Sequence, residues 1–228
     1  MSTDDYYSRR VRESRNPLWQ VGKTVNGEPV SEAQIDLIVE QISTLLSLTP
    51  SDCVLDIGAG NGLLTRRVAR RCRQVTGIER NADLVREAEA SSAGERIAYI
   101  CGSLMTQDWQ RLAFSKVYLY EVAQHLSYSD MAAFLARLSV ALPPGGRVLI
   151  GGVPNALEQW SFYGEGQRLR QYLAALADGA DVMGTWFHPQ FFNEVARSLG
   201  LVCRIHAQPE ALYTQGYRFD CVLEKPEA

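Results

Sequence analysis

The stretch CVLDIGAGNG, residues 53–62, places an acid and three glycines within seven positions: Asp56, Gly58, Gly60 and Gly62. Glycines after a short apolar run permit a sharp turn and let a ligand approach main-chain N–H groups. The spacing is GxGxG, and Leu63 stands where a dinucleotide-binding GxGxxG loop has its third small residue. A carboxylate here would repel a bound pyrophosphate and attract a cation. The stretch therefore predicts a site for a ligand that carries positive charge.

A second acid follows at the end of the next apolar run, VTGIE, where Glu79 comes 23 residues after Asp56. In nucleotide-binding βαβ units, an acid at this distance accepts hydrogen bonds from ribose hydroxyls. The two acids together predict a ligand with a ribose and a positive centre but no diphosphate. S-adenosylmethionine meets this description, because it carries a sulfonium and an ammonium group beside an adenosine.

Alternating strands and helices must position these residues. A capping-box pattern, Ser31 with Gln34, precedes apolar residues at helical spacing and predicts a first helix. Short β-branched runs then alternate with helical stretches, which predicts an α/β fold: a doubly wound, mostly parallel seven-stranded sheet with helices on both faces. The last two runs predict a C-terminal antiparallel hairpin at one edge. The predicted strands are 53–57, 74–78, 97–101, 115–120, 146–153, 200–206 and 217–224, and the later helices are 63–73, 82–90, 130–142 and 189–199.

Four stretches together resemble the class I S-adenosylmethionine-dependent methyltransferases of the small-molecule type. They are the glycine loop, GIE at 77–79, YEVAQHL at 120–126 and LPPGGRVLI at 142–150, so the resemblance covers about residues 50–155. It implies a Rossmann-like methyltransferase fold. It also implies S-adenosyl-L-methionine as the cofactor and S-adenosyl-L-homocysteine as its product.

The resemblance also implies a set of cofactor-binding residues. The backbone around Gly58 and Gly60 cradles the methionine part, and Glu79 holds the ribose diol. Where the family often has an Asp for the adenine amine, this chain has Ser103, so that contact is weaker or passes to the backbone of Leu104. The other residues implied at the cofactor are Asp56, Asn61, Arg80 and Tyr120.

The acceptor of the methyl group should lie after the fourth predicted strand, beside Glu121, Gln124 and His125. A hydroxyl acceptor must lose a proton, and His125 is the best candidate for a general base, with Glu121 as a second catalytic candidate. Two alternatives remain open. His125 packs against the following helix in one, and Glu121 orients the cofactor or is solvated in the other.

Two regions divide the chain: residues 1–30 form an arm or lid, and residues 31–228 form the methyltransferase domain, which contains an acceptor-site insertion near 154–187. The arm mixes aromatic and basic residues, and it would exclude water and favour an anionic acceptor. The aromatic residues at 186–187, just before a helix that starts with Pro, are expected to pack at the start of that helix, and His188 is a second candidate base. The predicted substrate-binding residues are Tyr7, Trp19, Asn155, Trp160, Tyr163 and His188.

The composition of the chain limits the classes of partner that we expect. The 23 basic and 26 acidic residues give a net charge of −3, which disfavours nucleic acid as a partner. The chain has no apolar run of about 18 residues, and its polar start lacks the apolar core of a secretory signal, so we expect a cytoplasmic protein without a membrane partner. The five scattered cysteines contain no CxxC pair, so they are expected to be buried thiols and no metal site is expected.

The sequence thus predicts a methyltransferase that acts on an oxygen or nitrogen atom of a small metabolite, with an anionic or sugar-containing compound as one form. Methylation of a protein or a nucleic acid is an alternative. Another is a non-catalytic S-adenosylmethionine-binding protein, and a dehydrogenase is a further contender. The identity of the acceptor and the oligomeric state stay open.

Overall fold

A seven-stranded sheet in the order β5-β4-β3-β6-β7-β9-β8 organises the fold. The computed structural model describes residues 3–92, 94, 96–179 and 183–227. Strands β3 to β7 pair in parallel, and β9 runs antiparallel between β7 and β8, so the predicted mostly parallel sheet with a C-terminal hairpin is confirmed. The strands of this sheet are β3 (Cys53–Ile57), β4 (Gln74–Glu79), β5 (Ile97–Cys101), β6 (Lys116–Tyr120), β7 (Arg147–Pro154), β8 (Val202–Ala207) and β9 (Arg218–Glu224).

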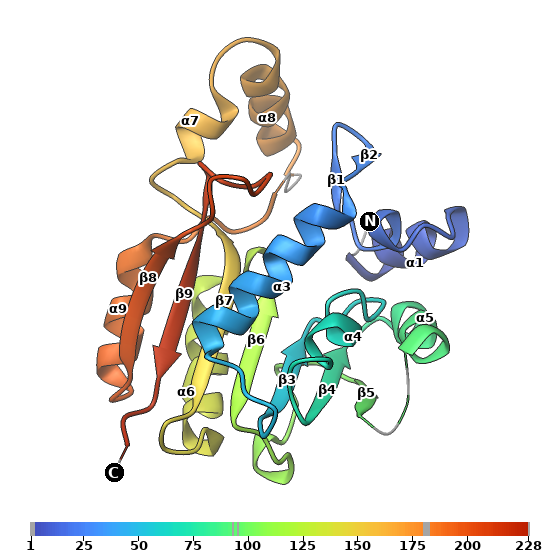
Figure 1. The fold of residues 1–228 in the computed structure, drawn as a ribbon. Coiled ribbons are helices and arrows are strands. Elements are labelled where there is room, and N and C mark those ends of the chain that lie inside the picture. The colour runs from blue at the N-terminus through green and yellow to red at the C-terminus, as the bar shows by residue number, and fades with distance from the viewer. Residues whose placement is uncertain (1–2, 93, 95, 180–182, 228) are drawn as a thin grey trace.

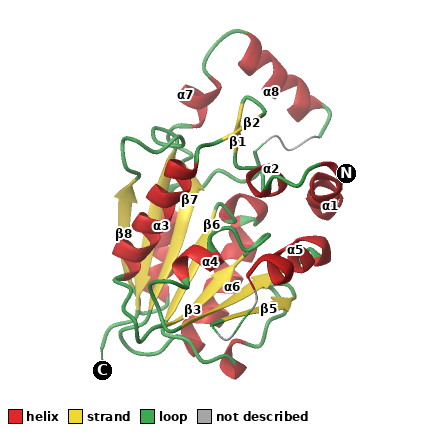
Figure 2. Ribbon diagram, turned by 45° about the vertical axis from the view of Figure 1, so that its right-hand side comes forward, coloured by secondary structure: helices red, strands yellow, loops and turns green. Residues whose placement is uncertain are grey.

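Helices cover both faces of the sheet (Figure 2). Because side chains alternate across a strand, neighbouring residues of β3 serve different cores: Val54 joins the cluster of α3, and Leu55 joins the cluster of α6 and α9. Ile38 anchors the first cluster, and Phe134 and Phe192 anchor the second; all three are fully buried. The helices of the sheet domain are α3 (Glu32–Leu46), α4 (Thr65–Val68), α5 (Ala82–Ser92), α6 (Tyr128–Ala141) and α9 (Pro189–Ser198), with the single turns η1 (Trp109–Arg111) and η2 (Ala123–His125).

Two local predictions differ from the structure. Ser31 precedes α3, but its side chain makes no capping hydrogen bond, and the Gln34 side chain does not complete a capping box because it is engaged elsewhere. The Gln34 side chain donates to the carbonyl of Ala211 at 2.9 Å and accepts from the backbone N–H of Tyr213 at 2.8 Å. The helix expected over 63–73 is shortened to α4, because the chain must return to the sheet, where the N–H of Arg73 donates to the carbonyl of Asp52.

The arm before α3 contains α1 (Thr3–Glu13), α2 (Pro17–Gln20) and a small hairpin of β1 (Thr24–Val25) and β2 (Glu28–Pro29). Helix α1 packs against α5, and the inserted helices α7 (Gln159–Tyr163) and α8 (Gln167–Ala177) project at the top of Figure 1. Among the helices of the described residues, none combines the length and apolarity that crossing a membrane requires. The arm and the insertion therefore lie at the same end of the sheet.

Candidate functional site

A cavity of about 890 Å³ lies at the carboxyl ends of β3, β4 and β6, under the arm. Ligands of open α/β sheets bind at this edge, and the volume is near the upper end of the roughly 300–1,000 Å³ usual for ligand pockets. The cavity brings together most of the residues predicted for the cofactor and for catalysis. These are Gly58, Gly60, Glu79, Arg80, Ser103, Leu104, Tyr120, Glu121 and His125, joined by Tyr7 of the arm.

The glycine loop and Glu79 form one wall. The Glu79 carboxylate, at the end of β4, accepts from the N–H of Gly60 at 3.1 Å and from the N–H of Asn81 at 2.8 Å. Gly58 has φ +75°, and a Cβ atom there would lie 2.4 Å from Cγ2 of Val122. Only glycine fits both this conformation and this approach. The loop thus presents bare backbone next to an acid that backbone N–H groups hold in place.

Asp56 does not reach the cavity. It is buried below the loop, where its Oδ2 accepts from the hydroxyls of Tyr118 at 2.5 Å and Thr65 at 2.6 Å. Burial raises the pKa of Asp56 to about 6, although these two hydrogen bonds oppose the shift. The sequence argument that Asp56 faces a cationic ligand therefore needs correction, because the structure makes this carboxyl a link between β3, β6 and α4.

Asn61 also has a different setting from the predicted one. Its Nδ2 donates to the carbonyl of Pro17 at 2.9 Å and to Oε1 of Gln20 at 2.8 Å, so this residue ties the glycine loop to the arm. A second tie joins Asn81 to Ser8, with 3.0 Å between Nδ2 and Oγ. Two asparagines that follow neighbouring strands thus hold the arm over the cavity.

A buried ion pair lies at the other end of the cavity. The ammonium of Lys23, from the arm, lies 2.8 Å from Oε2 of Glu121, and the hydroxyl of Tyr213 donates to Oε1 of Glu121 at 3.0 Å. Burial alone would raise the pKa of Glu121, but Lys23, Arg218 and the hydrogen bond from Tyr213 outweigh it and lower that pKa. Glu121 also has φ +57°, and a side chain at Gly152 would collide with it. Glu121 is a fixed carboxylate in a strained position.

His125 and Tyr7 face the cavity from opposite elements. Their rings meet edge to face with 6.3 Å between centroids, so the predicted base lies beside the arm. Burial raises the pKa of Tyr7, and Tyr6, Glu79 and Glu121 add to this shift. The phenol of Tyr7 is therefore protonated at neutral pH and lies within electrostatic reach of both cavity carboxylates.

The insertion does not supply the predicted lining residues. Tyr163 is buried in a separate aromatic cluster, stacked on Tyr172 with 3.6 Å between ring centroids. Trp160 is 62% exposed and contacts the edge of Tyr172. Instead, Met183 and Gly184, which follow α8, line the cavity. The aromatic residues of the insertion thus build its own small core.

The other predicted substrate residues also lie outside the cavity lining. Trp19 covers Arg10, whose guanidinium carbon lies 4.2 Å from the Trp19 ring centroid. Asn155 accepts from the N–H of Leu157 with its own side chain, a local turn contact. His188 is exposed and caps α9, its Nδ1 accepting from the N–H of Gln190 at 3.1 Å. His188 is therefore a helix cap. Phe187 packs against Phe191 and Phe192 at the start of α9 as predicted, but Trp186 packs in the aromatic cluster of Tyr163 instead.

Sequence reasoning missed two charged residues of the cavity, Lys23 and Arg218. Lys23 had a weak signal, since it lies in the basic arm. Arg218 begins β9 and donates through Nη1 to Oε1 of Gln124 at 2.9 Å and to the carbonyl of Gly152. No local pattern marks Arg218, because its hydrogen-bond partners come from η2 and β7.

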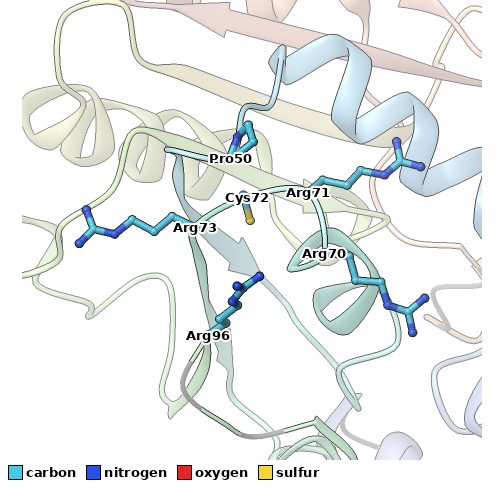
Figure 3. Close-up of a pocket in the computed structure, with 6 residues that line it drawn as sticks. All are labelled: Pro50, Arg70, Arg71, Cys72, Arg73 and Arg96. Atoms are coloured by element: carbon cyan, nitrogen blue, oxygen red, sulfur yellow. The ribbon is translucent and has the colours of Figure 1, made fainter.

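A second hollow, of about 320 Å³, lies at the amino-terminal end of β4 and is lined by Arg70, Arg71, Arg73 and Arg96 with Pro50 and Cys72. Figure 3 shows that Arg70, Arg71 and Arg73 extend outward and that Arg96 alone points toward Cys72. Arg71 forms an ion pair with Glu40 at 2.7 Å. The guanidinium groups do not converge on one point, so the larger cavity is the better candidate site.

Comparisons with known proteins show similarity to methyltransferases in sequence and in fold. Residues 54–146 match the family described as "Methyltransferase domain". An uncharacterized methyltransferase of Mycobacterium tuberculosis (strain ATCC 25618 / H37Rv) is 32% identical over 100 residues, 44% of this chain and 50% of that protein. A ubiquinone biosynthesis O-methyltransferase of Idiomarina loihiensis is 32% identical over 110 residues, 47% of this chain and 44% of that protein. The matches thus span about half the length of these relatives.

Among solved structures, magnesium protoporphyrin IX methyltransferase from Synechocystis PCC 6803, determined with bound SAM, has a TM-score of 0.61. Its sequence is 14% identical, and the match covers 98% of this chain and 92% of that one. At this identity the likeness shows the fold. The matched family segment, 54–146, contains the glycine loop, Glu79, Glu121 and His125, but not the arm or β9.

Proposed function

Because the chain belongs to the class I S-adenosylmethionine-dependent methyltransferases, we propose that it moves a methyl group from S-adenosylmethionine to an oxygen or nitrogen atom of a small metabolite. One observation carries the proposal. The cavity at the strand ends combines Glu79 beside a bare glycine loop with a volume of about 890 Å³, which leaves room for an acceptor next to the cofactor.

The residues at the β4 end of the cavity fit this cofactor. Glu79 would accept hydrogen bonds from the ribose hydroxyls, as acids at this strand end do in nucleotide-binding folds. Gly58 and Gly60 would let the methionine part lie against the backbone, with Tyr120 nearby. Arg80, Ser103 and Leu104 line the same end and would surround the adenine. Asp56 and Asn61 would support this wall from outside the cavity.

When bound, S-adenosylmethionine supplies an electrophilic methyl group on a sulfonium. The chain's own part is then to hold the acceptor in line and to keep water out, and alignment can contribute about 7–11 kcal/mol in favourable cases. The arm serves the second purpose, since Tyr6, Tyr7 and Lys23 roof the cavity. We infer that this roof acts as a lid.

For an acceptor that must lose a proton, we propose that His125 is the general base that accepts it. Glu121 is less suited to this role, because its pKa is lowered and both of its oxygens already accept from Lys23 and Tyr213. A general base works best when its pKa lies near the operating pH. Glu121 instead fixes the charge pattern at the acceptor end.

The enclosure of the cavity supports a small acceptor rather than a macromolecule. The arm closes one side, and Met183 and Gly184 close another, where the N–H of Thr185 donates to the carbonyl of Gln124 at 2.9 Å. A protein or nucleic-acid strand would have to displace one of these segments. An acceptor of a few tens of atoms would not.

The test is calorimetric titration with S-adenosylhomocysteine, followed by transfer from labelled S-adenosylmethionine to panels of hydroxyl and amine compounds. Glu79→Ala should weaken binding about 10- to 150-fold through lost charge-assisted hydrogen bonds. Glu40→Ala, a carboxylate paired with Arg71 away from the cavity, is the control. Binding of NAD without affinity for S-adenosylhomocysteine would refute the proposal, and binding without any transfer would favour a non-catalytic protein.

A further inference from the structure

The end of the cavity opposite Glu79 carries more positive than negative charge. Lys23 and Arg218 both line it, and among the described residues Glu121 is the one carboxylate that forms an ion pair with either of them. Two cations therefore share one anion. Charges buried without full pairing are costly, so this arrangement favours a ligand that brings a second negative charge.

The hydrogen bonds of the two cations are also incomplete. In the described part of the chain, Nε of Arg218 is buried and has no hydrogen-bond partner, and the ammonium of Lys23 has Glu121 as its one close charged partner. Lys23 is only 5% exposed, so solvent does not replace the missing partners. A buried donor left without an acceptor costs free energy, and an oxyanion in the cavity would supply acceptors.

The backbone of Lys23 and the side chain of Arg218 are held in place by their surroundings, and the Lys23 ammonium is held by Glu121. The backbone of Lys23 donates to the carbonyl of Leu18 at 2.9 Å and accepts from the N–H of Val30 at 3.0 Å. Arg218 is fixed through Nη1 to Gln124 and to the carbonyl of Gly152. Such preorganised cations bind an anion without losing much side-chain freedom.

The sheet order sets how far this place is from the cofactor end. Glu79 ends β4, Glu121 follows β6 two strands away, and Arg218 begins β9 two strands further on. At about 4.8 Å per strand, the backbone of Arg218 lies roughly 19 Å from that of Glu79 across the sheet. Resting on the proposed function, we infer that Lys23 and Arg218 form a carboxylate subsite that selects an anionic acceptor.

A carboxylate can come to this subsite from the acceptor or from the methionine part of the cofactor, and two ligand pairs separate the sources. The first pair is S-adenosylhomocysteine and its methyl ester. The second is 4-hydroxybenzoate and 4-hydroxybenzamide, titrated into protein saturated with S-adenosylhomocysteine. Lys23→Met and Arg218→Met should weaken the charged member of one pair about ten- to hundredfold and leave its neutral partner unchanged.

Three further variants keep the test decisive. Lys23→Arg should restore much of the preference for the charged ligand. The double variant Lys23→Met with Glu121→Gln removes both charges of the buried pair, in case the single change unfolds the protein. Lys116→Met, whose ammonium binds the carbonyl of Gly145 away from the cavity, is the control.

A selective loss in the benzoate pair supports the inference, and a selective loss in the homocysteine pair overturns it, because the two cations then hold the cofactor's carboxylate. Equal losses for charged and neutral ligands overturn the inference, as does a wild-type protein that prefers the charged member of neither pair. Failure of the wild type to bind S-adenosylhomocysteine or its ester would instead contradict the proposed function.

Discussion

The buried carboxyl of Asp56 gives a prediction with a defined sign and size. Its pKa is raised from 3.8 to about 6 in the folded protein because the carboxyl is buried. Between about pH 4 and pH 6, the unfolded chain releases this proton while the folded protein keeps it. The free energy of unfolding therefore falls as pH rises through this range, by up to about 3 kcal/mol at 1.36 kcal/mol per pKa unit, and the contribution is constant above it.

Asp56→Asn removes this titration and keeps an oxygen that can accept from Tyr118 and Thr65. The measurement is urea unfolding of wild type and variant from pH 4 to pH 7, followed by circular dichroism. Relative to wild type, the variant should gain up to about 3 kcal/mol between pH 4 and pH 6.5. Glu165→Gln, at an exposed residue between α7 and α8, controls for the general pH dependence.

The same variant tests where the carboxyl points. Because Asp56 lies below the cavity, Asp56→Asn should change the dissociation constant of S-adenosylhomocysteine by less than about threefold, well under the tenfold or more expected for a lost charged contact. A difference in stability that stays flat from pH 4 to pH 7 would show that the burial argument is wrong. A folded variant that binds S-adenosylhomocysteine tenfold more weakly would show that Asp56 contacts the cofactor.

Three other predictions concern the loop, the arm and the base. Gly58→Ala should lower the free energy of unfolding by about 1–3 kcal/mol and weaken S-adenosylhomocysteine binding, because φ is +75° and a Cβ atom would collide with Val122. The control is Gly94→Ala, since a Cβ atom there would meet open space. Equal melting temperatures for the two variants would contradict this prediction. Removing residues 1–28 should abolish methyl transfer while the circular dichroism of the sheet domain persists; full activity would refute a lid role. His125→Ala should lower the maximal rate and leave cofactor affinity unchanged, and an intact rate would mean that His125 only packs.

The sequence predicts best what short-range patterns control. The strands and the glycine loop follow from apolar periodicity and from glycine spacing, and each depends on residues within a few positions. Glu79, the acid predicted to hold a ribose, lines the cavity because it ends the strand after the loop. These features make up the sheet and the end of the cavity that Glu79 lines.

The side-chain positions that the sequence does not predict depend on partners far away along the chain. Asp56 turns inward because Tyr118, 62 residues later, donates to it. The Gln34 side chain does not cap the helix, because it donates to a carbonyl in a loop 177 residues away. The charged end of the cavity depends on the ion pair of Lys23 with Glu121 and on the hydrogen bond of Arg218 to Gln124, and no pattern in the basic arm predicts these partners. Aromatic residues of the insertion were predicted as lining because their pattern does not distinguish a separate cluster from a pocket wall.

The placement of α1 and of the residues that follow β9 matters for handling this chain. The first helix belongs to the roof of the cavity, and the chain's last residues emerge beyond β9 at the far end of the sheet (Figure 1). A bulky fusion partner at the N-terminus would crowd the docking of α1 on α5 and loosen the ties made by Asn61 and Asn81. Purification tags and attachment to a surface are therefore better placed after β9, where they do not obstruct the cavity.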